Sequence, residues 1–244
     1  MHASGRRAGY GIDVPGRVVA ATVLTALFAL VTVFAGSAAG PLAALAPLLA
    51  FLAAAAWLGL QVWASQVGKR TLWTRVLDEL DLAGDEDALD LGCGRGLVLV
   101  EVARRLPDGR VTGVDVWRPT DLSGNHPAVA QANADLEGVG ERVELRHADL
   151  TAPLPFADGS FDLVTGGLVL RALPDDTARS TALGEAVRVL RPGGRAVFVD
   201  SAHTEACADE LRRVGLVDVT QSGRQLGVFP PGRVVSGTRP VAAA

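Results

Sequence analysis

The sequence is poor in lysine, tyrosine and cysteine. Lys69 is the only lysine and Tyr10 the only tyrosine among the 244 residues, and the two cysteines are Cys93 and Cys207. Two cysteines are too few for a disulfide framework, and they lack the paired spacing of a zinc site. We therefore expect no bound metal and a reducing, cytoplasmic setting.

The chain also lacks a strong excess of charge of either sign. It has 23 basic and 27 acidic residues, for a formal net charge of -4. This balance offers no broad basic surface for phosphates, so it disfavours nucleic acid as a partner. A chain of 244 residues accommodates one full α/β domain and a small appendage.

Charge is absent altogether from two long N-terminal stretches, residues 18–39 and 42–63, each of 22 residues. As helices they would each be about 33 Å long, which is enough for a hydrocarbon core of roughly 30 Å. We predict a hairpin of two transmembrane helices within residues 1–66. A cleaved signal peptide would have a shorter apolar region. A buried helical hairpin inside a larger soluble fold stays open as an alternative.

The charges around this hairpin predict its orientation. The connection between the stretches is uncharged, whereas basic residues flank both outer ends: Arg6, Arg7 and Arg17 before the first stretch, and Lys69, Arg70 and Arg75 after the second. Basic flanks favour the cytoplasmic side. We expect a multi-pass protein of the cell membrane, with its N-terminus and everything after the hairpin in the cytoplasm.

Residues 67–244 alternate between short apolar strands and helical stretches, which is typical of a parallel sheet. The pattern predicts strands at 88–91, 110–114, 143–146, 161–165, 195–200, 217–221 and 234–238. It predicts helices at 71–80, 97–106, 127–137, 176–190 and 204–214. The expected fold is α/β, a Rossmann-like doubly wound, mostly parallel seven-stranded sheet that ends in an antiparallel hairpin.

The run LDLGCGRG, residues 89–96, lies where the first strand gives way to the first helix of this domain. Glycines at 92, 94 and 96 allow a tight turn and a close approach to a ligand, at a helix N-terminus with free amides. The spacing is Gly-x-Gly-x-Gly preceded by Asp90, rather than the Gly-x-Gly-x-x-Gly that suits a pyrophosphate. A carboxylate there attracts an ammonium group, which favours a zwitterionic ligand.

Two further acids end the second and third strands. Asp115 follows the last glycine by about 20 residues, a position suited to both ribose hydroxyls, and Asp149 is placed to accept a hydrogen bond from an adenine amino group. Each acid also has a simpler explanation, because Asp90 could cap a helix, Asp115 could end a strand and Asp149 could lie on the surface. Together they fall at the carboxyl ends of adjacent strands, where α/β sheets bind ligands.

Four ordered motifs, LDLGCGRG, GVDVW, HADLTAPLPFADGSFDLV and RVLRPGG, resemble those of class I S-adenosylmethionine methyltransferases. The resemblance covers roughly residue 71 to the end and is nearest to the ubiquinone and menaquinone biosynthesis methyltransferases. It implies that the glycine turn holds the methionine part of S-adenosylmethionine, Asp115 the ribose and Asp149 the adenine. The residues expected at this cofactor are Asp90, Gly92, Cys93, Gly94, Gly96, Asp115, Val116, Trp117, Asp149 and Leu150. Cys93 is also explained as a small buried residue of the turn.

The acceptor side of the site is less defined, and we assign no catalytic base from the sequence. Arg171 stands where some relatives have a histidine, so it either binds an acidic group of the acceptor or is a solvated arginine. His203 either faces the pocket as a base or merely neighbours a helix cap. In the segment 117–127, Trp117 could pack on the adenosine, and Asn125 or His126 could close the site; alternatively, this segment is a capped loop.

These features predict a membrane-tethered methyltransferase that acts on a small or lipophilic, lipid-like acceptor at the cytoplasmic face. A nicotinamide-dependent oxidoreductase is the first alternative, disfavoured by the glycine spacing and by the lack of a Tyr-x-x-x-Lys pattern. The second is a cofactor-binding membrane module without catalysis.

Overall fold

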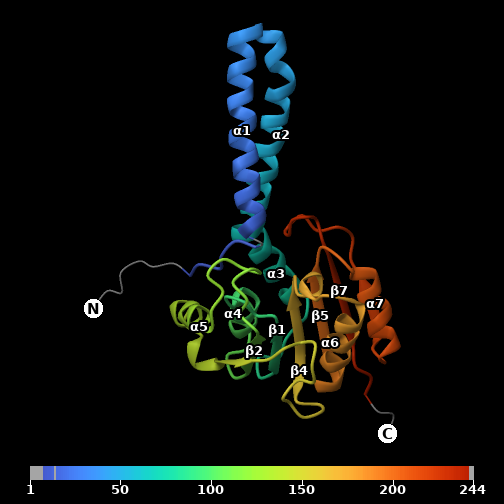
Figure 1. The fold of residues 1–244 in the computed structure, drawn as a ribbon. Coiled ribbons are helices and arrows are strands. Elements are labelled where there is room, and N and C mark those ends of the chain that lie inside the picture. Colours follow the sequence, from blue (N-terminus) through green and yellow to red (C-terminus); the bar gives the residue numbers. More distant parts are fainter. Residues whose placement is uncertain (1–7, 14, 242–244) are drawn as a thin grey trace, which may run out of the picture.

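Two long helices project together from a globular α/β domain in the computed structural model, which describes residues 8–13 and 15–241 (Figure 1). They are α1 (Pro15–Ala39) and α2 (Pro41–Trp63), which pack side by side as a hairpin. The helix of α2 continues through a π-helical segment, η1 (Ala64–Gly68), into α3 (Lys69–Asp78). We predicted a separate linking helix at 71–80; instead, one helical rod runs from Pro41 to Asp78 because no proline interrupts it after Pro47.

The hairpin keeps its apolar side chains outside the core of the domain. Leu30, Phe34 and Leu49 are 67%, 71% and 67% exposed. Both helices are long and apolar enough to be candidate membrane spans. The predicted stretches 18–39 and 42–63 coincide with them, and this exposure does not fit a hairpin buried within the chain's own core. Arg6 and Arg7 lie outside the described residues.

The domain contains the predicted seven-stranded sheet, with strand order β3-β2-β1-β4-β5-β7-β6. β7 runs antiparallel to β5 and β6, and the other pairings are parallel. The strands are β1 (Asp87–Leu91), β2 (Arg110–Asp115), β3 (Val143–His147), β4 (Phe161–Gly167), β5 (Leu190–Asp200), β6 (Val217–Gln221) and β7 (Arg233–Thr238). This arrangement confirms the Rossmann-like fold predicted from the alternating pattern.

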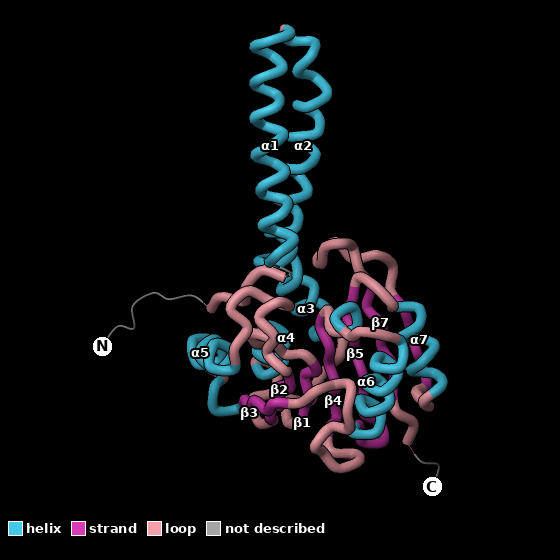
Figure 2. Tube along the Cα trace, in the orientation of Figure 1, coloured by secondary structure: helices cyan, strands magenta, loops and turns pink. Residues whose placement is uncertain are grey.

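Helices cover both faces of the sheet (Figure 2). They are α4 (Leu97–Ala103), α5 (Pro127–Leu136), α6 (Asp176–Val189) and α7 (Thr204–Arg213), beside α3. Successive residues of a strand point to opposite faces, so Leu163 belongs to the core with α3 and α4, whereas Val164 belongs to the core with α6 and α7. Two buried cores, one on each face, make the sheet doubly wound.

The start of β5 differs from the expected boundary. The RPGG segment was expected to separate the helix from a strand beginning at residue 195, but Leu190 already pairs with Phe161 in β4. The register then shifts before Arg195, and Gly193 has a φ of +83°. The glycine pair therefore lies within β5, where it makes the strand irregular, and it does not form a separate turn before the strand.

Residues 8–13, which we call the N-terminal strap, pack against the domain although they precede the hairpin. The Tyr10 side chain lies in the core and is 6% exposed. The Gly9 amide donates to Asn133 Oδ1 at 3.0 Å, and the Ile12 amide donates to Ser123 Oγ at 2.8 Å. The predicted domain boundary between residues 66 and 67 remains a prediction. Residues 8–13 precede that boundary in the chain, yet they pack on the surface of the domain that follows it.

The end of the strap also joins the two legs of the hairpin. Lys69 Nζ lies 2.8 Å from Asp13 Oδ1, and Lys69 is only 7% exposed. The Asp13 amide lies 3.3 Å from Ser65 Oγ. The chain therefore enters and leaves the hairpin at nearly one point.

Asp90 is a carboxyl group inside the core, 1% exposed, and it joins three elements. Its Oδ1 accepts a hydrogen bond from Thr165 Oγ1 of β4 at 2.9 Å, and its Oδ2 accepts one from the Leu99 amide of α4 at 3.1 Å. Burial raises the pKa of Asp90 to about 7, because desolvation disfavours the charged form.

We predict that Asp90→Asn reduces the pH dependence of stability. The pKa of Asp90 is higher in the folded than in the unfolded state, so its contribution to stability falls as pH rises from about 4 to 7. An asparagine accepts from Leu99, donates to Thr165 and carries no titrating proton. Relative to the parent, the variant should gain stability across this window, by at most on the order of 4 kcal/mol. Melting temperatures in one detergent at pH 4.5 and 7.5 measure this, and parallel pH profiles would contradict it.

A second prediction concerns the strap. Replacing residues 15–63 with a short Gly-Ser linker keeps the strap, because Asp13 and Ser65 are in contact, whereas starting the chain at residue 67 removes it. Burial of an aromatic side chain contributes about 2 kcal/mol or more. The linked form should therefore melt roughly 4–8 °C higher, and Tyr10→Ala in that form should remove most of the difference. Equal melting of all three forms would show that the strap adds no stability.

Candidate functional site

The backbone turns tightly between β1 and α4. Gly92, Gly94 and Gly96 have φ values of +67°, +54° and +83°, in the region where side chains are strained. A Cβ atom on Gly92 would lie 2.7 Å from Val169 Cγ2, so the position leaves no room for a side chain. Gly96 is the N-cap of α4. The predicted glycine turn therefore exists, and its shape depends on glycine.

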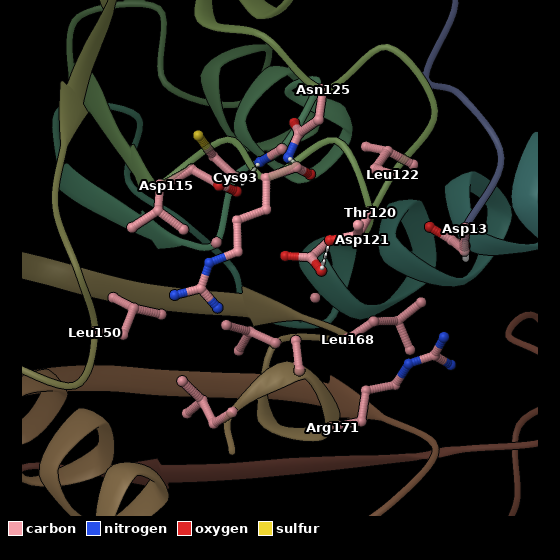
Figure 3. A pocket seen from close by; sticks show the side chains of 18 of the residues that line it. Asp13, Cys93, Asp115, Thr120, Asp121, Leu122, Asn125, Leu150, Leu168 and Arg171 are labelled. Atoms are coloured by element: carbon pink, nitrogen blue, oxygen red, sulfur yellow. Dashed lines mark hydrogen bonds between the residues drawn. The ribbon is translucent and has the colours of Figure 1, made fainter. Parts of the chain in front are cut away.

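A cavity of about 710 Å³ opens over this turn, at the carboxyl ends of the parallel strands. Its volume lies within the range of small-molecule sites, about 300 to 1,000 Å³. Figure 3 shows Cys93 and Asp115 at one end of the cavity, Asp13 at the other and Asp121 between them. The predicted residues that line it are Gly92, Cys93, Gly94, Asp115, Val116, Asp149, Leu150, Arg171 and His203.

Asp115 is held at the end of β2 by backbone donors on two sides. The Gly94 amide donates to Asp115 Oδ2 at 2.8 Å, and the Trp117 amide donates to Oδ1. Burial raises the pKa of the Asp115 carboxyl, and these hydrogen bonds oppose the rise. The carboxylate is therefore fixed in direction at the cavity wall, where each oxygen can accept a further bond.

Asp149 has a different environment at the end of β3. It is exposed, and its Oδ1 accepts hydrogen bonds from the Thr151 amide and hydroxyl at 2.9 and 2.8 Å. These bonds lower the pKa of Asp149. Cys93 differs again, because burial raises the pKa of its thiol well above the ordinary value. A buried neutral thiol is a poor nucleophile, so Cys93 acts as wall of the cavity.

Three predicted cofactor residues lie outside the cavity lining. Asp90 is behind the turn, bonded to Thr165 and Leu99, and Gly96 is in the helix cap. The Trp117 indole lies between the glycine turn and β3: its Nε1 donates to Gly94 O at 3.0 Å, and its ring lies 6.3 Å from that of His147. Trp117 therefore supports the glycine turn from outside, and Asp90 supports it from below.

The insertion 117–127 does contribute to the site, through Asn125. This side chain lines the cavity, is 7% exposed and donates to Arg118 O at 3.2 Å. Its Oδ1 is buried and has no hydrogen-bond partner among the described residues. His126 is directed elsewhere, because its Nδ1 caps α5 by accepting from the Ala128 amide at 3.1 Å.

The other end of the cavity is formed by residues that the sequence did not identify as site residues. They are Tyr10 and Asp13 of the strap, Arg17 of α1, Lys69 of α3 and Pro230 of the loop after β6. Arg171 lies at this end, with Nη1 3.2 Å from Ser201 Oγ, and the exposed His203 is the N-cap of α7. The sequence contains one signal for this end of the cavity: Asp13 is the first acidic residue and the next is Asp78, so Asp13 is an isolated acid beside the apolar stretches.

The residues at the glycine-turn end suit S-adenosylmethionine. Asp115 is a fixed double acceptor for vicinal hydroxyls, and the orphaned Asn125 Oδ1 is a buried acceptor beside the turn, suited to an ammonium group. A Cβ on Gly94 would lie 3.0 Å from Leu122 Cδ2 and 3.8 Å from Asn125 Oδ1, so the glycine lets the turn pack closely beside this acceptor. Across residues 8–13 and 15–241, no cluster of three metal-ligating side chains occurs.

Comparison with known proteins gives the same family. The family described as "Methyltransferase domain" matches residues 88–194. A demethylmenaquinone methyltransferase of Lactiplantibacillus plantarum is 35% identical over 141 residues, covering 57% of this chain and 55% of its own length. A nocamycin O-methyltransferase of Saccharothrix syringae is 37% identical over 127 residues, covering 52% and 41%. The chain spans about half the length of the curated relatives that it matches.

Solved structures share the fold. A SAM-dependent methyltransferase from Aquifex aeolicus has a TM-score of 0.55 and 18% identity, over 68% of this chain and 88% of that one. The [4+2]-cyclase SpnF has a TM-score of 0.57 and 21% identity, over 71% and 82%. Ordered motifs, sheet topology and these matches agree: residues 88–194 form a methyltransferase domain, in the fold of the class I S-adenosylmethionine-dependent methyltransferases.

Proposed function

We propose that this chain is a membrane-tethered methyltransferase that transfers the methyl group of S-adenosylmethionine to a small or lipophilic acceptor at the cytoplasmic face of the membrane. The observation that supports this most is the extent of the cavity. It runs from the glycine turn and Asp115 to Arg17 and Lys69, at the base of the apolar hairpin. A molecule at its far end would lie beside the segment proposed to enter the membrane.

The cofactor would be held by the glycine turn, with Asp115 at the ribose, Asp149 and Leu150 at the adenine and Asn125 near the ammonium group. Bound there, S-adenosylmethionine supplies an electrophilic methyl group on a sulfonium. The protein then needs to align the acceptor and exclude water, and alignment alone accounts for much of such an acceleration. If the acceptor is a hydroxyl, the His203 imidazole on the cavity wall is our candidate to take its proton.

The acceptor end combines apolar and basic groups. Arg17 and Arg171 line it, and no salt bridge to either occurs among the described residues, whereas Lys69 is paired with Asp13. This setting suits a lipophilic molecule with an acidic or polar head. The relative named demethylmenaquinone methyltransferase carries the name of a lipophilic substrate, which supports the same class of acceptor here.

The proposed orientation rests on the basic residues at the hairpin base. Arg17 lies in the first turn of α1, and Lys69 and Arg70 come after the end of α2. Arg70 Nε lies 2.9 Å from Glu101 Oε1, so it also holds the rod against the domain. Basic residues favour the cytoplasmic side, and the domain and strap lie on the side of the hairpin where these residues are.

A second candidate is a cofactor-binding module at the membrane that transfers no methyl group. The structural neighbour named as a [4+2]-cyclase supports keeping it, because this fold carries activities other than methyl transfer. The nicotinamide-dependent alternative has less support, since the relatives are named as methyltransferases.

We predict that Asp115→Ala weakens S-adenosylmethionine binding by roughly tenfold to several hundredfold, because each charge-assisted hydrogen bond contributes about 1.5–3 kcal/mol. Asp115→Asn keeps an acceptor for one amide and should lose less. Calorimetric titration gives the affinities, and Asp209→Ala, on the exposed face of α7, is the matched control. Unchanged affinity, or a loss that accompanies unfolding, would remove Asp115 from the site.

For the intact chain, we predict recovery in membranes that resist high-salt and alkaline washing. Incubation of these membranes with S-adenosylmethionine labelled in its methyl group should transfer label to an organic-extractable product, and the Asp115→Ala membranes serve as the background. Soluble recovery without detergent would contradict the tether. Selective binding of NAD in place of S-adenosylmethionine would contradict the proposed chemistry.

A further inference from the structure

The loop between β6 and β7, residues 222–232, rises from the domain to the base of the hairpin (Figure 1). It is packed directly against the helical rod through a pair of glycines. A Cβ on Gly227 would lie 2.7 Å from Gly68 O, and a Cβ on Gly68 would lie 2.7 Å from Gly227 O. The two backbones approach so closely that neither position has room for a side chain.

Further contacts hold this loop in place. Arg75 Nη2 donates to Gln225 Oε1 at 2.9 Å, and the Val228 side chain is 2% exposed. The ring of Phe229 lies edge-on to the ring of Trp57, with centroids 5.8 Å apart. The loop is therefore packed in a defined position against the base of the hairpin.

The contact with Trp57 indicates the depth of the loop. Trp57 lies six residues before Trp63, the last residue of α2 and of the uncharged stretch 42–63, and six residues correspond to about 9 Å along a helix. Phe229 reaches that level from outside the hairpin. Next to it in the chain, Pro230 lines the cavity.

The loop also presents an apolar group to its surroundings. Leu226 is 72% exposed, although large apolar side chains gain from burial. Residues 222–232 contain no acidic residue. Their only charged residue is Arg224, which is exposed. An exposed leucine, an aromatic ring and one arginine suit the boundary between lipid headgroups and acyl chains.

We propose that the β6–β7 loop is a third membrane contact, which inserts Leu226 and Phe229 into the lipid interface beside the hairpin. This inference rests on the proposed membrane tether. Because Pro230 faces the cavity from the same loop, the loop also forms a wall between the lipid phase and the acceptor end of the cavity. A lipophilic acceptor would pass beside this wall without crossing bulk water.

A fluorescent probe at Leu226 tests this in the full-length chain. Cys93 and Cys207 are buried, 6% and 1% exposed, so a single added cysteine can be labelled selectively. Leu226→Cys, Leu136→Cys on α5 and Leu49→Cys in the second span would each carry an environment-sensitive dye. Leu136 is 48% exposed and is the last residue of α5, a helix that lies away from the hairpin (Figure 1), so it is the matched control.

The labelled proteins are reconstituted in phosphatidylcholine–phosphatidylglycerol vesicles containing lipids spin-labelled near the headgroup or at mid-chain. We expect the Leu226 probe to shift its emission to the blue and to lose about half its intensity with the shallow spin label. The Leu136 probe should be unaffected, and the Leu49 probe should be quenched by the mid-chain label.

Quenching at Leu49 with none at Leu226 would overturn the loop contact and leave the tether intact. Absence of quenching at Leu49 would overturn the tether, and the loop contact with it. Equal quenching at Leu226 and Leu136 would also overturn the inference, because the whole domain surface would then lie against lipid.

Discussion

The unbroken helix from Pro41 to Asp78 determines how the rest of the molecule is arranged. Its 38 residues correspond to about 57 Å of helix, of which the upper part is apolar and the lower part packs on the sheet. Trp73, fully buried in the core, fixes the lower part to the domain. Because no flexible linker intervenes, the hairpin and the sheet hold one relative position, and the cavity opens at the base of the hairpin.

Within the domain, a few polar groups shape the glycine turn from several directions. Asp90 supports it from the core, Asp115 accepts the Gly94 amide, and the Trp117 indole bonds to the Gly94 carbonyl. The turn thus owes its form to side chains of β1, β2 and the segment after β2. This explains why acids at adjacent strand ends occur together with the glycines in the sequence: they organise one backbone loop as well as its ligand.

The sequence predicted the features that depend on local pattern. Alternating apolar strands and helices predicted the mostly parallel seven-stranded sheet, and the glycine spacing predicted the turn, because both follow from neighbours in the chain. The roles of Asp90 and Trp117 were less accessible, since a side chain's direction depends on partners such as Thr165 and His147, which are distant in sequence. The far wall of the cavity was missed for the same reason. Asp13 meets Lys69, which lies 56 positions later in the chain on the other side of the hairpin, and no sequence periodicity reports such a contact.

The strap also has a consequence for the order of assembly during synthesis. Gly9 binds Asn133, 124 residues later in the chain, so its partner does not exist when the strap leaves the ribosome. At about 5–20 residues per second, the delay is roughly 6–25 s. The hairpin is complete well within that interval. The strap can therefore dock only after α5 has been made, and the cavity wall that it contributes forms after the hairpin has been synthesised.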